Sequence, residues 1–178
     1  MKNSIEFSKW FMVSSAVVLC LMTAAMASAQ APTNKLRIGV YDSRAVAAAY
    51  VNSTEFQEML KTGYADYEKA KAANDEKRAK ELDSRMKLLQ RWVHEQVFST
   101  GSVRDIVAKV KGALPGVAKK AGVQAIVSKW ELNYQGPDVE LVDVTEDLGV
   151  LFHASDNKQK WRGILKGPPP LSMDEVGD

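Results

Sequence analysis

The longest helix-forming stretch of this 178-residue chain lies between two regions with a strand pattern. Residues 54–98 contain no proline and one glycine, Gly63, and they are rich in alanine, lysine, glutamate and arginine. These residues favour helix, and an unbroken helix of this length would be roughly 68 Å long. Such a helix is longer than a compact domain needs, so the sequence predicts a helical segment that projects from a smaller body.

Two apolar seams run along this stretch. The seams are Phe56, Leu60, Tyr64 and Tyr67, and then Leu82, Met86, Leu89, Val93 and Val97. Their spacing of three and four residues is close to that of a coiled coil. Between them, residues 68–81 offer only alanine as an apolar side chain. A helix with so little apolar surface buries little, so we expect residues 68–81 to lie in water.

The flanking regions indicate a small sheet and shorter helices. The patterns predict strands at 36–41, 123–128, 131–135 and 139–142, with a turn at 136–138. A helix at 102–122 is expected to kink at Pro115 and to end at Gly122. Asp143 or Thr145 can cap a final helix. The predicted fold class is α+β, a small β-sheet body with a long inserted α-helical, coiled-coil-like arm.

The first residues have the pattern of a secretory signal. Lys2 and Lys9 precede an apolar core at 10–22, and Ala27-Ser28-Ala29 supplies small residues for cleavage. We predict a signal peptide at 1–29 and export to the periplasm, with a retained N-terminal anchor as the alternative. Cys20 is the sole cysteine, so the cleaved chain would hold no thiol. Residues 154–178, which contain three consecutive prolines, are predicted to form a flexible or loosely docked tail.

The sequence contains no recognisable catalytic or metal-binding motif. His94-Glu95 begins like a metalloprotease helix, but Phe98 stands where the second histidine is needed. The other histidine, His153, is distant in sequence. We therefore predict that the protein is not an enzyme and has no catalytic, cofactor-binding or metal-binding residues and no cofactor.

Charge is distributed unevenly along the chain. Residues 61–129 hold 15 basic and 8 acidic side chains, a balance of +7, whereas residues 131–178 hold 4 and 10, a balance of −6. The first region should attract anions. The cleaved chain has 22 basic and 21 acidic residues, a net charge of +1, which argues against nucleic acid as a partner.

Segments before and after the helical stretch resemble one protein family. Residues 37–42, Arg-Ile-Gly-Val-Tyr-Asp, resemble the first strand of the OmpH/Skp family of periplasmic chaperones. Residues 121–129, Tyr134 and residues 143–148 are similar to the closing strands and helix of that family. The resemblance divides residues 30–153 into a β body, 36–51 and 122–153, and a helical arm, 54–121.

The resemblance implies a homotrimer that binds unfolded outer-membrane proteins, with lipopolysaccharide as a further ligand. The oligomer core would contain Ile38, Val40, Ala125 and Val127. The client-binding arm would use Tyr64, Tyr67, Lys77, Arg78, Lys80, Arg85, Met86 and Lys87. The sequence leaves two positions open for the tip of the arm, near 74–75 or at 99–102.

A second function fits the same residues. The chain could be an oligomeric adaptor or structural protein of the cell envelope that recognises one folded partner and has no holdase activity. A holdase needs a lining that tolerates many chains, whereas an adaptor needs one contiguous apolar patch.

Overall fold

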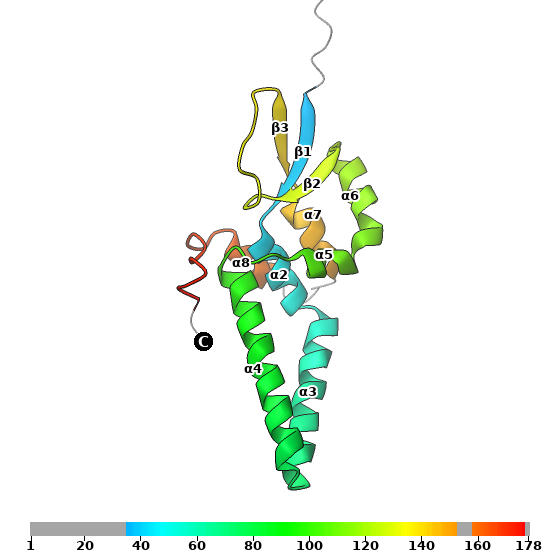
Figure 1. Cartoon of the computed structure of the whole chain (residues 1–178). Coiled ribbons are helices and arrows are strands. Elements are labelled where there is room, and N and C mark those ends of the chain that lie inside the picture. Colours follow the sequence, from blue (N-terminus) through cyan, green and yellow to red (C-terminus); the bar gives the residue numbers. More distant parts are fainter. Residues whose placement is uncertain (1–34, 153–157, 177–178) are drawn as a thin grey trace, which may run out of the picture. The chain divides into compact units, whose positions relative to one another are not determined.

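The chain forms a mixed helical and stranded body, as a computed structural model shows for residues 35–152 and 158–176 (Figure 1). The expected small sheet is confirmed and has three strands. The predicted signal peptide at 1–29, Cys20 and His153 lie outside the described residues.

All strand pairs in the sheet are parallel, in the order β2-β1-β3. The strands are β1 (Leu36–Tyr41), β2 (Ala125–Ser128) and β3 (Val139–Asp143). The strand predicted at 131–135 is wrong, because this segment is part of an irregular connection between β2 and β3. Because β2 and β3 both run parallel to β1, all three strands begin at the same end of the sheet. The chain therefore has to return to that end between one strand and the next.

The two faces of the sheet differ in what covers them. On one face, a Cβ atom added to Gly39 would lie 3.2 Å from Val123 Cγ2 and 3.3 Å from Ile126 Cγ1, so glycine allows this close approach. The other face carries the four residues of the predicted oligomer core, in the register Ile38↔Ala125 and Val40↔Val127. Within the described part of the chain, these four residues are not part of the buried hydrophobic cluster.

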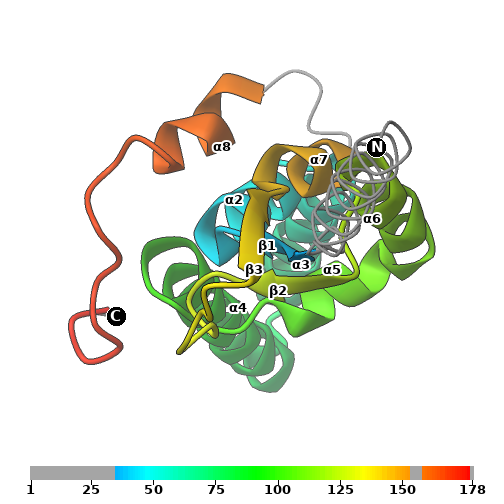
Figure 2. The same ribbon diagram turned by 90° about the horizontal axis from the view of Figure 1, so that it is seen from above.

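Helix α2 (Ser43–Val51) is the centre of the core, and its residues 43–50 are all buried. It packs against α4 (Glu76–Phe98), α7 (Thr145–Gly149) and α8 (Lys158–Ile164). Figure 2 shows α7 beside α2. Four residues of α2 are alanines, at 45 and 47–49. A helix that is surrounded on all sides needs such small apolar side chains, because they let neighbouring elements approach.

A buried carboxylate joins α2 to the ends of the strands. Asp42 is 1% exposed and caps α2 by accepting from the backbone N–H of Arg44 at 3.0 Å. Its side chain also accepts from Arg44 Nη2 at 3.1 Å, Lys129 Nζ at 2.8 Å and Trp130 Nε1 at 3.3 Å. Its backbone N–H donates to Thr145 Oγ1 at 2.9 Å. One residue thus connects the chain beyond β1 with the segments that follow β2 and β3.

The helical stretch at 54–98 is not one unbroken helix but is divided into two helices. Helix α3 (Thr54–Ala72) and α4 form an antiparallel hairpin (Figure 1). The chain turns at 73–75, the earlier of the two predicted positions for the tip. Asn74 has φ 55°, a left-handed conformation that asparagine tolerates better than most residues. Asp75 then caps α4 through the backbone N–H of Arg78, at 3.0 Å.

The helix predicted at 102–122 is also divided. It consists of α5 (Arg104–Lys109), the 3-10 turn η1 (Lys111–Ala113) and α6 (Leu114–Ala121). Pro115 lies in the first turn of α6, where its missing N–H costs no hydrogen bond, so it begins a helix and does not kink one. The predicted end at Gly122 is confirmed, with φ 65°.

Part of the segment that the sequence assigns to a flexible or loosely docked tail packs on the body. After α7 and the 3-10 turn η2 (Val150–Phe152), α8 places Trp161 at 1% exposure, with its ring against Gly149. Farther on, the Leu171 N–H donates to the Phe98 carbonyl at 2.9 Å, and Arg44 Nη1 donates to the Pro168 carbonyl at 2.9 Å. These contacts place parts of residues 158–176 on the body, as the docked alternative for this tail expects.

We predict that Asp42→Asn destabilises the fold by about 3 kcal/mol near neutral pH, because it leaves the buried Arg44 guanidinium without its carboxylate. Burial raises the pKa of Asp42, but the hydrogen bonds and charges of Arg44 and Lys129 outweigh it and hold the pKa below its ordinary value. A lowered carboxyl pKa stabilises the fold above about pH 4 and less so as pH falls through the folded-state value. Urea unfolding should therefore show the difference between variant and wild type shrinking in acid. A difference independent of pH would contradict this role of the Asp42 charge.

We also predict that the left-handed residue at the hairpin turn limits which side chains fit there. Asn74→Val should lower the free energy of unfolding by about 1 kcal/mol, whereas Asn74→Gly should leave it unchanged or raise it. The matched control is Ala73→Val, at a neighbouring residue with φ −82°. Equal losses for Asn74→Val and Ala73→Val would show that the conformation at residue 74 is not the cause.

Candidate binding groove between helices α3 and α4

The two helices of the hairpin meet near their tip and separate toward the body (Figure 1). Close to the tip, the small side chain of Ala70 is buried, and its carbonyl accepts from the Asp75 N–H at 2.9 Å. Toward the base, the larger side chains of Phe56 and Trp92 stand on the facing helices. Small residues at the tip and large residues at the base favour helices that diverge, which leaves a space between them.

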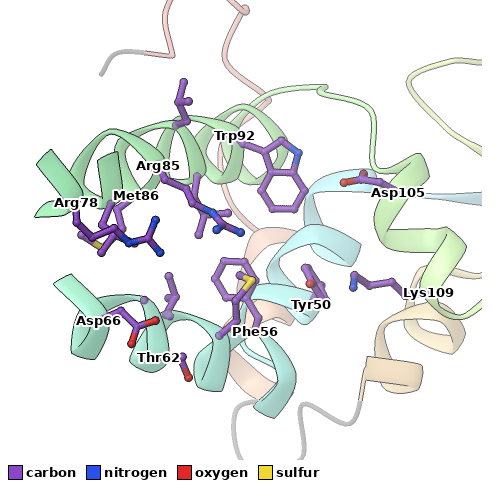
Figure 3. Close-up of a pocket in the computed structure, with 16 residues that line it drawn as sticks. Tyr50, Phe56, Thr62, Asp66, Arg78, Arg85, Met86, Trp92, Asp105 and Lys109 are labelled. Carbon is purple, nitrogen blue, oxygen red and sulfur yellow. The ribbon is translucent and has the colours of Figure 1, made fainter. Parts of the chain in front are cut away.

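That space is a cavity of about 700 Å³, which we call the hairpin groove. Figure 3 shows Trp92 from α4 and Phe56 from α3 pointing into it. Its apolar lining consists of Phe56, Met59, Leu60, Leu82, Met86, Leu88, Leu89 and Trp92. Most of these residues belong to the two seams seen in the sequence, so the divergence of the helices leaves part of the seams open to a ligand.

The base of the hairpin groove is held by contacts from α2 and α5. The Tyr50 ring packs edge-on against Phe56, with ring centres 5.3 Å apart, and Lys109 Nζ lies 5.2 Å from the centre of the Tyr50 ring. Lys109 also pairs with Glu55 at 2.8 Å. This hydrogen bond with Glu55, together with Tyr50, raises the pKa of Lys109. The base of the groove therefore holds Lys109 in its protonated form, paired with Glu55.

Charged side chains are spread along the groove. Arg78, Arg85 and Lys109 line it, together with Asp66 and Asp105. Arg78 Nη1 lies 3.4 Å from Glu81 Oε2, and Asp66 Oδ1 lies 3.9 Å from Lys69 Nζ. In the part of the chain that the structure describes, Arg85 forms no ion pair. The lining is thus mainly apolar with a cationic excess.

The structure brings three of the eight predicted client-binding residues to the groove: Arg78, Arg85 and Met86. The other five do not line it: Tyr64, Tyr67, Lys77, Lys80 and Lys87. Tyr64 is 58% exposed, and Tyr67 lies under Lys71, with 5.4 Å from Nζ to the ring centre. Lys87 forms an ion pair with Asp83 at 2.9 Å.

Sequence reasoning missed most of the apolar lining as a binding surface. The sequence pattern assigns Phe56, Leu60, Leu82 and Leu89 to the packing of a coiled coil and gives no prominence to Met59 or Trp92. The bulky Trp92 close to the seam at Leu89 and Val93 is the available signal, because a side chain of this size does not fit a regular two-helix seam.

Across residues 35–152 and 158–176, no group of three or more His, Cys, Asp or Glu side chains could hold a metal ion. Among these same residues, no helix is both long and apolar enough to cross a membrane. No protein-family model, curated protein or solved structure matches the chain.

Proposed function

We propose that the protein is a periplasmic holdase that binds unfolded outer-membrane proteins through its helical hairpin. The observation that carries this proposal is the hairpin groove, an open apolar cavity with cations along its length. Such a lining can hold apolar segments of many chains, while its charges keep the unoccupied surface soluble. The finer description of the hairpin as a long coiled-coil arm belongs to this proposal.

Two methionines support broad binding. Met59 on α3 and Met86 on α4 line the groove from opposite sides, and Met59 is 43% exposed. Methionine side chains are flexible and polarisable, so they adapt to ligand side chains of different shape. Promiscuous binding proteins use such surfaces, which is the property that a holdase requires.

The open face of the sheet supports assembly of the protein with itself, and we propose a homotrimer. Purely parallel sheets normally have both faces covered. Here the face of Ile38, Val40, Ala125 and Val127 continues onto Leu36, which is 48% exposed. Two further copies of the chain could cover this face and carry their hairpins on a shared β body.

A groove variant tests holdase activity. Met59→Glu, which places a charge in the groove at an exposed position, should reduce suppression of aggregation of a urea-denatured outer-membrane barrel protein at least several-fold. The control is Ala65→Glu, at an exposed position of α3 that does not line the groove. Light scattering during dilution from urea measures the effect. Equal protection by both variants would contradict binding in the groove, and no protection by wild type would exclude the holdase function.

A sheet variant tests the trimer. Val40 pairs with Asp143 in β3, so Val40→Lys can place its charge beside a carboxylate of its own chain and still block an apolar contact with another copy. Analytical ultracentrifugation should show a trimer for wild type and a folded monomer for Val40→Lys. Ala65→Lys on the hairpin should remain trimeric. A wild-type chain that sediments as a monomer would defeat the proposal.

The same open face supports a second candidate, an oligomeric adaptor of the cell envelope without holdase activity. An adaptor needs a contiguous apolar patch for one folded partner, and the sheet face offers one. The aggregation assay separates the two candidates, because an adaptor would give no protection to a denatured barrel protein.

A further inference from the structure

We propose that the hairpin groove selects peptide segments in which a carboxylate stands next to apolar residues, and that Arg85 binds that carboxylate. This inference rests on the proposed function, because it names the class of segment that the groove prefers. Composition alone would predict only a general attraction of the basic hairpin for acidic chains.

Among the residues that the structure describes, Arg85 differs from the other cations of the groove in having no carboxylate partner. Arg78 has Glu81 at 3.4 Å, and Lys109 has Glu55 at 2.8 Å. In the described ranges, 35–152 and 158–176, no carboxylate lies within ion-pairing distance of Arg85. Figure 3 shows its guanidinium in the space between α4 and α3. An apolar groove therefore contains one cation whose partner can come from a ligand.

The chemistry of the guanidinium favours a carboxylate as that partner. Its planar set of donors can bind both oxygens of one carboxylate. The neighbouring side chains Met86 and Leu89 on α4 are apolar and half-buried, and a ligand that covers them displaces water from around the pair. Removal of water strengthens an ion pair relative to one in solvent. Binding of the apolar part and binding of the carboxylate should thus support each other.

The groove fits a peptide better than an acyl chain. Its cations come from three places, Arg78 and Arg85 on α4 and Lys109 on α5, and its acids, Asp66 and Asp105, lie on α3 and α5. An acyl chain carries its charge at one end, whereas a peptide carries polar groups along its whole length. Two antiparallel helices with apolar facing sides also form the type of groove in which peptides dock.

Peptide binding tests the selection. The probes are three fluorescein-labelled peptides with the same apolar core and one variable neighbour, which is glutamate, glutamine or lysine. Fluorescence anisotropy with the full protein should give a dissociation constant about fivefold lower for the glutamate peptide than for the glutamine peptide, and the highest value for the lysine peptide. The difference should shrink in about 1 M salt, where charges are screened within about 3 Å.

Variants of Arg85 assign the effect. Arg85→Gln should bind the glutamate and glutamine peptides equally, and Arg85→Glu should reverse the order in favour of lysine. The control is Arg91→Gln, because Arg91 lies on the same helix outside the groove lining and pairs with Glu95 at 3.2 Å. It should keep the preference of wild type. Loss of the preference in Arg91→Gln as well would overturn the role of Arg85 in favour of a general charge effect.

The remaining outcomes separate this inference from the proposed function. Equal binding of all three peptides by wild type, with aggregation still suppressed, would overturn the selection and leave the holdase intact. Failure to bind any peptide, together with failure to suppress aggregation, would overturn both. Tight binding of oleate with no binding of any peptide would also overturn the inference, in favour of a lipid ligand.

Discussion

The structure depends on the buried carboxylate of Asp42. It lies where β1 ends and α2 begins, and it accepts hydrogen bonds from Arg44 and from two side chains, Lys129 and Trp130, that follow β2. A buried charge is tolerated only when it is paired and hydrogen-bonded, so these segments have to meet around it. Arg44 then extends the same network to the Pro168 carbonyl, and the C-terminal segment becomes part of the body.

Side-chain size gives the hairpin its form. An alanine is buried near the tip, where the helices are close, while Phe56 and Trp92 face each other near the base, where Tyr50 and Lys109 support them. A regular coiled coil would fill its seam with side chains of similar size. The uneven sizes leave a groove between the helices, in which Met59 and Leu88 are exposed apolar side chains, and we propose that clients bind there.

The sheet and the hairpin would serve the proposed function in different ways. The sheet has one face on the core and one face of half-buried and exposed apolar residues, which parallel strands normally cover. The hairpin extends from α2, whose residues are buried on all sides. An assembly through the sheet would leave each groove attached to a rigid base, and it could present several grooves to one client chain, which strengthens binding without new contacts.

Local patterns in the sequence were sufficient for several elements. Alternation of apolar residues predicted β1, helix-forming residues predicted the long helical stretch, and Gly122 marked the end of α6. These features depend on neighbours within a few residues, so the sequence by itself determined them. The tertiary structure alone decided that the strands are parallel, that the chain turns at Asn74 and that Trp161 and Leu171 dock on the body. It also decided which seam residues line the groove. The reason is physical: strand order, helix divergence and the partners of a buried charge depend on contacts between residues far apart in the chain, and no local pattern records them.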